Sequence, residues 1–190
     1  MTKIFVDESE HILDGYRLGT QIYASGFRPS FIVGLWRGGS TVGIVVQECL
    51  ATLGVETDHI ALRTSYEGRA EYESTAKLNR QIRVHGKQYL LESMNCDDRL
   101  LIVDDVFSSG RHTRAVIDAL KRGLKRNMPG DVRVASIWLR GPTGSEESEP
   151  DFYLHTTRDW VVLPFEVQGL SAAEMDAHKP YLKQLLPSDV

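Results

Sequence analysis

Short apolar runs alternate with amphipathic stretches along most of the chain, and this alternation predicts its secondary structure. Residues 8 to 26 repeat apolar side chains at helical spacing, and the positions expected to face inward are Ile12, Leu13, Tyr16, Ile22 and Tyr23. Apolar runs that predict strands lie at 31–35, 59–62, 82–84, 100–103 and 132–139. Helical patterns follow at about 40–53, 87–94, 111–126 and 171–186, the last with Ser171 as its expected N-cap.

Strands and helices alternate over residues 30–139, which predicts an α/β fold with a mostly parallel sheet flanked by helices. The short runs at 152–154 and 160–165 predict a small C-terminal β hood. We therefore expect a core over residues 1–140, and a base-binding hood with a C-terminal helix over 141–190. Residues 65–80 are polar and aperiodic, which is typical of a flexible lid.

The composition of the chain argues against some classes of binding partner but does not identify one. Apolar residues make up 42% of the chain and charged residues 25%, as in ordinary globular proteins. The net charge of −4 and the absence of an obvious basic face argue against nucleic acid as a partner. No stretch is apolar enough for a membrane span, and no signal peptide is expected. Two cysteines without metal or disulfide spacing favour a cytoplasmic location.

The segment LLIVDDVFSSGRHT, residues 100–113, concentrates the chemistry. An apolar strand runs into Asp104 and Asp105, then into a small polar loop that opens a helix. Backbone N–H groups at such a helix N-terminus suit a phosphate, and Gly110 permits close approach of the ligand. The two carboxylates suit sugar hydroxyls or Mg²⁺. The alternative is a plain strand-to-helix turn in which an aspartate serves as a cap.

This segment resembles the phosphoribosyl pyrophosphate signature of the type I phosphoribosyltransferases. Other family motifs are matched in order: Leu35–Gly39 resembles the pyrophosphate loop, and Ser65-Tyr66 resembles the pair that opens the catalytic lid. Residues 134–140 resemble the strand that ends at the base-recognition residue, and residues 159–166 resemble the base-stacking hood. The likeness is greatest to the purine branch, the xanthine-guanine and hypoxanthine enzymes.

The resemblance implies a cytoplasmic, Mg²⁺-dependent glycosyltransferase of purine salvage. It would join a 6-oxopurine base (hypoxanthine, guanine or xanthine) to phosphoribosyl pyrophosphate, releasing pyrophosphate, and would form a homodimer or homotetramer. The implied catalytic residues are Asp104, Asp105, Ser108, Ser65 and Tyr66. The implied substrate-binding residues are Arg37, Gly38, Gly39, Ser109, Gly110, Arg111, His112, Thr113, Arg140, Trp160 and Val161. Asp105 and Glu166 would hold the metal, and the peptide bond between Trp36 and Arg37 would be cis.

Three positions depart from the family pattern. Ser108 stands where purine enzymes usually carry the aspartate that meets the base, His112 replaces a threonine, and Arg140 replaces a lysine. A serine hydroxyl is a poor general base at neutral pH. The alternative function is therefore a catalytically weak homologue of the same fold that senses nucleotides or binds RNA. A nucleotide-binding α/β module that makes no product is a third interpretation.

Overall fold

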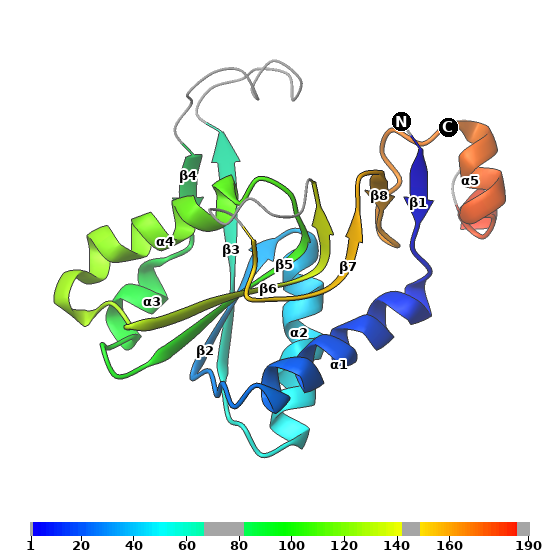
Figure 1. The fold of residues 1–190 in the computed structure, drawn as a ribbon. Coiled ribbons are helices and arrows are strands. Elements are labelled where there is room, and N and C mark those ends of the chain that lie inside the picture. Colours follow the sequence, from blue (N-terminus) through cyan, green and yellow to red (C-terminus); the bar gives the residue numbers. More distant parts are fainter. Residues whose placement is uncertain (1, 67–81, 142–148, 186–190) are drawn as a thin grey trace. The chain divides into compact units, whose positions relative to one another are not determined.

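The computed structural model describes residues 2–66, 82–141 and 149–185. Figure 1 shows a central sheet with helices on both sides. The strands are β1 (Lys3–Phe5), β2 (Phe31–Trp36), β3 (Asp58–Tyr66), β4 (Ile82–His85), β5 (Arg99–Phe107), β6 (Asp131–Arg140), β7 (Phe152–Thr157) and β8 (Trp160–Val162). The α-helices are α1 (Glu8–Ala24), α2 (Gly38–Thr52), α3 (Gln88–Ser93), α4 (Arg111–Leu124), α5 (Ala172–His178) and α6 (Leu182–Leu185).

The main sheet confirms the predicted fold class. Its strand order is β4-β3-β2-β5-β6-β7, and every neighbouring pair is parallel except β3 with the edge strand β4. Strand β5 occupies the interior of the sheet, and Leu100 to Val103 are all fully buried. A strand covered on both faces is apolar without alternation, which explains this four-residue run.

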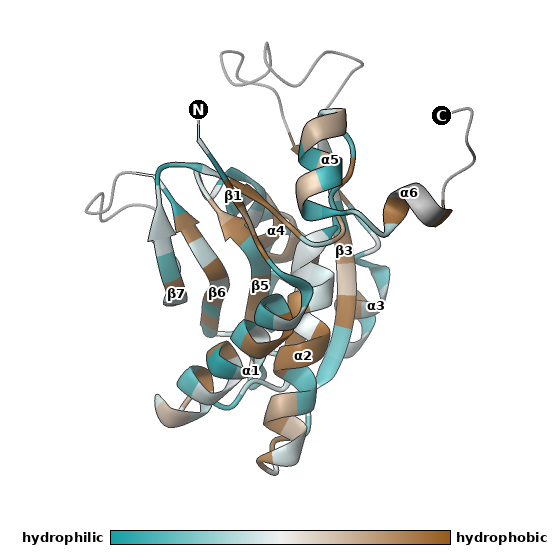
Figure 2. Ribbon diagram, turned by 90° about the vertical axis from the view of Figure 1, so that its right-hand side faces the viewer, coloured by the Kyte–Doolittle hydropathy of each residue, from teal (hydrophilic) through white to brown (hydrophobic). Residues whose placement is uncertain are grey.

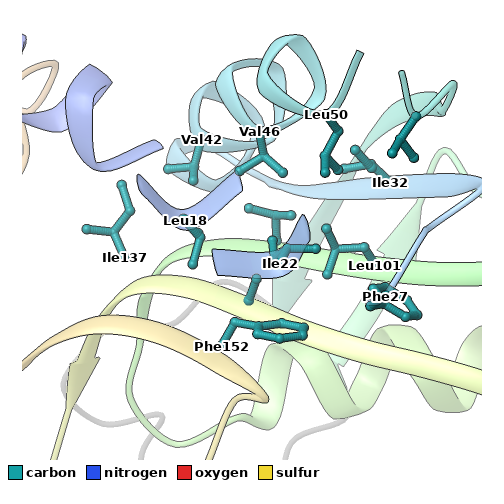
Figure 3. Close-up of a cluster of buried hydrophobic side chains, with 13 residues drawn as sticks. Leu18, Ile22, Phe27, Ile32, Val42, Val46, Leu50, Leu101, Ile137 and Phe152 are labelled. Atoms are coloured by element: carbon teal, nitrogen blue, oxygen red, sulfur yellow. The ribbon is translucent and has the colours of Figure 1, made fainter. Parts of the chain in front are cut away.

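The two faces of the sheet carry separate hydrophobic clusters. Leu101 and Val103 pack with α1 and α2, as the labelled side chains of Figure 3 show. Leu100 and Ile102 pack with α3 and α4 on the opposite face. In Figure 2, α2 and the central strands carry much of the hydrophobic colour. The alternate residues of β5 therefore hold both helical layers on one strand.

Glycines bring α1 close to α2, and this contact overturns part of the predicted inward face of α1. A Cβ added to Gly15 would lie 2.7 Å from Val45 Cγ1, and one added to Gly19 would lie 2.7 Å from Cys49 Cβ. Ile12, Leu13 and Tyr16, expected inward, are instead 40–45% exposed. The sequence pattern misled because small residues, which carry little hydrophobic signal, form this face. Leu18 and Ile22 complete it, fully buried.

Two side chains buried under this face were not expected from the sequence. The Asp14 carboxylate is 1% exposed and accepts a hydrogen bond from Arg17 Nη1 at 2.7 Å, and His155 Nε2 lies 2.7 Å from its other oxygen. The second is Cys49, whose thiol donates to the Tyr16 carbonyl oxygen and whose pKa is raised by burial. These two hydrogen-bonding partners make it possible to bury Asp14, since an unpaired buried carboxylate is costly.

The chain divides into two compact units, Ile12–Arg158 and a second one made of Met1–His11 with Asp159–Val190. This grouping differs from the expected boundary near residue 140. Strand β7, expected in the hood, is an edge strand of the main sheet, where Ala135 pairs with Phe152. In the second unit β8 pairs in parallel with the N-terminal strand β1. A partner so distant in sequence leaves no local signal.

The C-terminal helix is shorter than predicted, because the chain turns between α5 and α6. Ser171 is the N-cap of α5, as expected, and forms a capping box with Glu174. Lys3 of β1 pairs with that glutamate at 2.7 Å, which joins α5 to the two-stranded ribbon. Of the helices in the described ranges, none combines the length and the hydropathy that crossing a membrane requires.

Replacing Leu101 by Ala should lower the free energy of unfolding by about 2–5 kcal/mol, because the side chain is fully buried and its removal leaves a cavity. Urea unfolding of the purified protein measures this loss. Leu53→Ala is the matched control, since Leu53 is 38% exposed, and it should cost less than about 1 kcal/mol. Equal losses in the two variants would contradict the assignment of Leu101 to the core.

Candidate functional site

The loop between β5 and α4 forms a small concave site at the helix N-terminus. Its cavity of about 40 Å³ is lined by Asp104, Val106, Phe107, Ser108, Ser109, Gly110, Arg111, His112 and Thr113. Gly110, at the N-cap of α4, has a φ of 64°, which favours glycine. A Cβ there would also lie 2.7 Å from Phe107 Cζ. The loop therefore depends on glycine for its shape.

Thr113 provides an independent indication that a ligand belongs in this cavity. Its side chain is 3% exposed, yet no hydrogen-bond partner of its Oγ1 lies among the described residues. A buried hydroxyl without a partner costs free energy, and native proteins rarely keep one. The hydroxyl sits in the first turn of α4, where the backbone N–H groups and the helix dipole favour an anion. A phosphate oxygen would satisfy it.

The acidic pair lies inside β5, because the strand extends to Phe107 rather than ending at Val103. Both carboxylates are half-buried and turn back onto the backbone: Asp104 Oδ1 accepts from Asp105 N at 3.0 Å, and Asp105 Oδ1 accepts from Val106 N at 2.8 Å. Burial, and next the charge of Asp105, raise the pKa of Asp104 well above its ordinary value. A cation or hydroxyl donors beside the pair would relieve this cost.

Ser136 of β6, which sequence reasoning missed, fixes the backbone beyond the acidic pair. Its buried Oγ accepts a hydrogen bond from Phe107 N at 3.1 Å. The same oxygen lies 3.1 Å from the carbonyl oxygen of Asp105 and 3.0 Å from that of Trp138. The only available signal was a serine within an otherwise apolar strand. Its contacts hold the end of β5 where the phosphate loop begins.

The predicted pyrophosphate loop is seated directly on β5. The peptide bond between Trp36 and Arg37 is cis, as the resemblance implies. Arg37 is exposed at the N-cap of α2, and Gly38 and Gly39 are buried behind it. A Cβ on Gly39 would lie 2.4 Å from the Val103 carbonyl oxygen and 2.9 Å from Asp104 Cα. The structure thus brings the Arg37 loop and the acidic pair together, and a side chain at residue 39 would separate them.

A hydrogen bond joins the phosphate loop to β3. His112 Nδ1 lies 2.8 Å from Thr64 Oγ1, so the imidazole that replaces the usual threonine contacts the strand before the predicted lid. Thr64 was missed, since only tertiary packing places it there. Ser65 Oγ lies 2.9 Å from His85 Nε2 of β4, and Tyr66 ends β3, paired with Ile82. The rest of the predicted lid, 67–80, lies outside the described residues.

Arg140 ends β6 beside the loop that holds Ser108 and Ser109, both of which are exposed. The next residue, Gly141, is close enough that an added Cβ would lie 3.8 Å from the Ser108 carbonyl oxygen. The predicted phosphate, pyrophosphate and base-recognition positions of this unit therefore share the carboxyl edge of the sheet. Such an edge is where ligands bind in open parallel sheets.

The remaining predicted site residues belong to the second unit. Trp160 is 39% exposed and lines a cavity of about 330 Å³ with Lys3, Val162, Glu166, Gln168, Gly169 and Leu170. Val161 is buried and pairs with Ile4 of β1. The Glu166 carboxylate, predicted to hold metal, accepts a hydrogen bond from Leu163 N at 3.1 Å and closes a turn. An aromatic face on a cavity of this size suits a planar ligand.

Removing the buried hydroxyl should separate binding from folding. Thr113→Val keeps the shape of the side chain, so the free energy of unfolding should stay equal or rise by about 1 kcal/mol. The affinity for inorganic phosphate should fall several-fold, measured as the phosphate-dependent increase in the midpoint of urea unfolding. A variant that is less stable than the wild type without phosphate would indicate that the hydroxyl already has a partner.

Burial, followed by the charge of Arg111, lowers the pKa of His112. Because folding lowers it, the unfolded chain binds this proton more tightly. The histidine's contribution to stability is therefore intact above the unfolded pKa of about 6.5 and is lost as the pH falls through it. Urea unfolding at about pH 7 and about pH 5.5 should show a smaller loss for His112→Gln than for the wild type. An equal loss would contradict this assignment.

Comparison with solved structures identifies several that resemble this chain. A purine phosphoribosyltransferase from Pyrococcus horikoshii Ot3 shares 22% identity at a TM-score of 0.65, covering 90% of this chain and 98% of its own. A hypothetical protein from Neisseria gonorrhoeae with bound ppGpp shares 15% identity at 0.69, covering 97% and 98%. The Helicobacter pylori xanthine-guanine-hypoxanthine phosphoribosyltransferase shares 15% identity at 0.62, covering 96% and 99%.

These likenesses extend over nearly the whole of each chain, so they concern the complete architecture and not only one motif. No protein-family model matches the sequence, and no curated protein matches it either. The mostly parallel sheet, the cis peptide after β2 and the strand–acidic pair–loop–helix segment agree with the resemblance drawn from the sequence. The chain therefore has the fold of the type I phosphoribosyltransferases.

Proposed function

We propose that the protein is a purine phosphoribosyltransferase that transfers the phosphoribosyl group of phosphoribosyl pyrophosphate to a 6-oxopurine, releasing pyrophosphate. The observation that carries this proposal is the buried hydroxyl of Thr113, which has no hydrogen-bond partner among the described residues and lies in a loop-and-helix cavity that begins at Asp104. This hydroxyl favours a phosphate bound next to the Asp104 carboxylate. A sugar phosphate also carries ring hydroxyls that can donate hydrogen bonds to that carboxylate. The similar P. horikoshii protein is named a purine phosphoribosyltransferase, and the similar H. pylori protein is named a xanthine-guanine-hypoxanthine phosphoribosyltransferase.

Each part of the donor then has a counterpart in the chain. Backbone N–H groups of residues 109–113 and the Thr113 hydroxyl hold the 5-phosphate. Asp104 and Asp105 accept hydrogen bonds from the ring hydroxyls, and Arg37 with the amides of Gly38 and Gly39 holds the leaving pyrophosphate. The base nitrogen attacks C1 of the ribose as the C1–O bond to pyrophosphate breaks. Catalysis then consists of positioning and of stabilising charge on the leaving group.

The acidic pair also fits a magnesium ion. Asp105, next to a carboxylate whose pKa burial raises, supplies the oxygen ligands that Mg²⁺ prefers. When bound, Mg²⁺ would neutralise the charge of the pyrophosphoryl group. Glu166 stays a predicted metal residue; its hydrogen bond to Leu163 N also gives it a structural role in its turn. For the base we propose Trp160 as the stacking residue, Val161 as a backbone contact and Arg140 as the donor to the 6-oxo group.

Ser108 and one similar structure favour a second candidate, a nucleotide sensor. The exposed serine hydroxyl cannot serve as a strong base where purine enzymes usually carry an aspartate. The N. gonorrhoeae protein contains bound ppGpp, a guanine nucleotide with two pyrophosphate groups. A chain that keeps the phosphate and pyrophosphate positions but turns over slowly would suit such a ligand. In this case binding of ppGpp would be tight, and pyrophosphate release would be absent.

One assay separates the two candidates. The protein is incubated with Mg²⁺, phosphoribosyl pyrophosphate and, in turn, hypoxanthine, guanine, xanthine, adenine, uracil and orotate, while pyrophosphate release is recorded. We expect release with one or more of the three 6-oxopurines and loss of activity with a chelator. Silence with every base, together with ppGpp binding by calorimetry, would instead establish the sensor.

Substitutions at the acidic pair and in the loop test the roles of individual residues. Asp105→Ala should lower kcat/KM by about 10²-fold or more, because it removes a contact to the ribose and a metal ligand. Ser108→Asp should raise kcat by up to about 10²-fold, as expected when a general base is restored. Asp118→Ala, an exposed carboxylate on α4, is the matched control and should leave the rate unchanged. A rate that Ser108→Asp leaves unchanged or lowers would show that Ser108 is not what limits catalysis.

A further inference from the structure

The charge of this acidic protein is unevenly distributed, and α4 with the 3-10 turn Lys125–Asn127 after it is strongly basic. The chain holds 22 basic and 26 acidic residues, yet residues 111–127 contain six basic residues and one acidic residue, Asp118. The α4 basic stripe consists of Arg111, Arg114, Lys121, Arg122, Lys125 and Arg126. The net charge of the chain therefore hides a strongly positive surface element, which the sequence-based expectation of no basic face did not foresee.

Four residues of the stripe lie along one side of α4, and Lys125 and Arg126 belong to the 3-10 turn that follows it. At about 100° per residue, Arg111, Arg114, Lys121 and Arg122 fall within an arc of roughly 100°. The opposite side is the core side, where Val116, Leu120 and Leu124 are buried. With 14 residues, α4 is about 21 Å long, and its basic residues from Arg111 to Arg122 span about 17 Å of it. In Figure 1 the helix lies on one side of the sheet, next to α3.

The charges at the C-terminal end of the stripe are available to a partner. Lys121, Arg122, Lys125 and Arg126 are all exposed, and within residues 2–66, 82–141 and 149–185 they form no ion pair. Basic residues in the last turn of a helix interact favourably with the helix dipole, but one or two of them are enough for that effect. The dipole therefore explains only some of the six basic residues of the stripe.

The stripe lacks the features of a protein–protein interface. Such interfaces are anchored by aromatic or large aliphatic side chains. None of the exposed large hydrophobic side chains in the described residues lies on α4; the nearest along the chain is Tyr89 of α3. The apolar side of α4 is already used in the core, so the helix cannot insert into a lipid surface. A linear, arginine-rich array without an apolar anchor instead matches the spaced charges of a phosphodiester backbone.

We propose that the α4 basic stripe binds the phosphate backbone of RNA, independently of sequence and of the transferase activity. Four to six contacts to a single strand would make the logarithm of the binding constant fall with the logarithm of salt concentration, with a slope of about −3 to −4. Specific recognition of bases is not part of this surface, which has no aromatic side chain for stacking.

Two double variants of equal charge change test the proposal on the full chain. Arg122→Gln/Arg126→Gln removes two charges from the stripe, and Arg99→Gln/Arg158→Gln removes two exposed arginines elsewhere. Binding of a fluorescein-labelled single-stranded RNA is followed by anisotropy between about 50 and about 200 mM salt. The stripe variant should bind roughly tenfold more weakly near 100 mM salt, with a slope shallower by about 1.4, and the control should match the wild type.

Control measurements decide how each result of the RNA-binding experiment is interpreted. Pyrophosphate release, or ppGpp binding if the protein proves to be a sensor, should be the same in both variants, which shows that both are folded. No RNA binding by the wild type at about 50 mM salt, or equal weakening in the two variants, would overturn the proposal. Displacement of the RNA by a poly-glutamate peptide of equal charge, or stronger binding to phosphatidylserine vesicles than to RNA, would also overturn it in favour of another acidic partner.

Discussion

The contact of Gly39 with the end of β5 is the constraint on which the candidate site depends. The Arg37 loop joins β2 to α2 and the acidic pair lies in β5, the neighbouring strand of the sheet. They meet only because residue 39 has no side chain against the Val103 carbonyl oxygen. Parallel pairing of β2 with β5 brings the two strand ends level, with Gly34 opposite Val103. Backbone geometry, more than side-chain contacts, thus sets the distance between a pyrophosphate and a ribose in the proposed site.

Backbone geometry also sets the shape of the phosphate loop. Gly110 has a positive φ and leaves room for the Phe107 ring, while Ser136 holds the backbone from the neighbouring strand. The shape of the loop is therefore fixed by the protein's own packing before any ligand binds. The carboxylates and Thr113 can then keep unfavourable environments, one with a raised pKa and one without a partner, that a bound sugar phosphate would relieve.

The sequence predicted the elements whose patterns are local. The buried run at Leu100–Val103, the helix after Gly110 and the capping box at Ser171 each leave a signal within a few residues. It did not predict what depends on distant partners. The pairing of β1 with β8, the place of β7 at the sheet edge and the contact of Thr64 with His112 join segments far apart in the chain. Ile12 and Tyr16 were predicted to be buried and are exposed. The reason is that closely packed helices meet through their small residues, so the glycines of α1 face α2 instead of these apolar side chains.

The close packing of α1 on α2 also makes the two cysteines chemically unequal. Cys49 lies beneath Gly19 with its thiol bonded to the Tyr16 carbonyl oxygen and its pKa raised, whereas Cys96 is exposed in the turn before β5. A maleimide reacts with thiolates that it can reach, so the folded chain should accept one label at Cys96. Modification of the second thiol then becomes a measure of how often the α1–α2 layer opens.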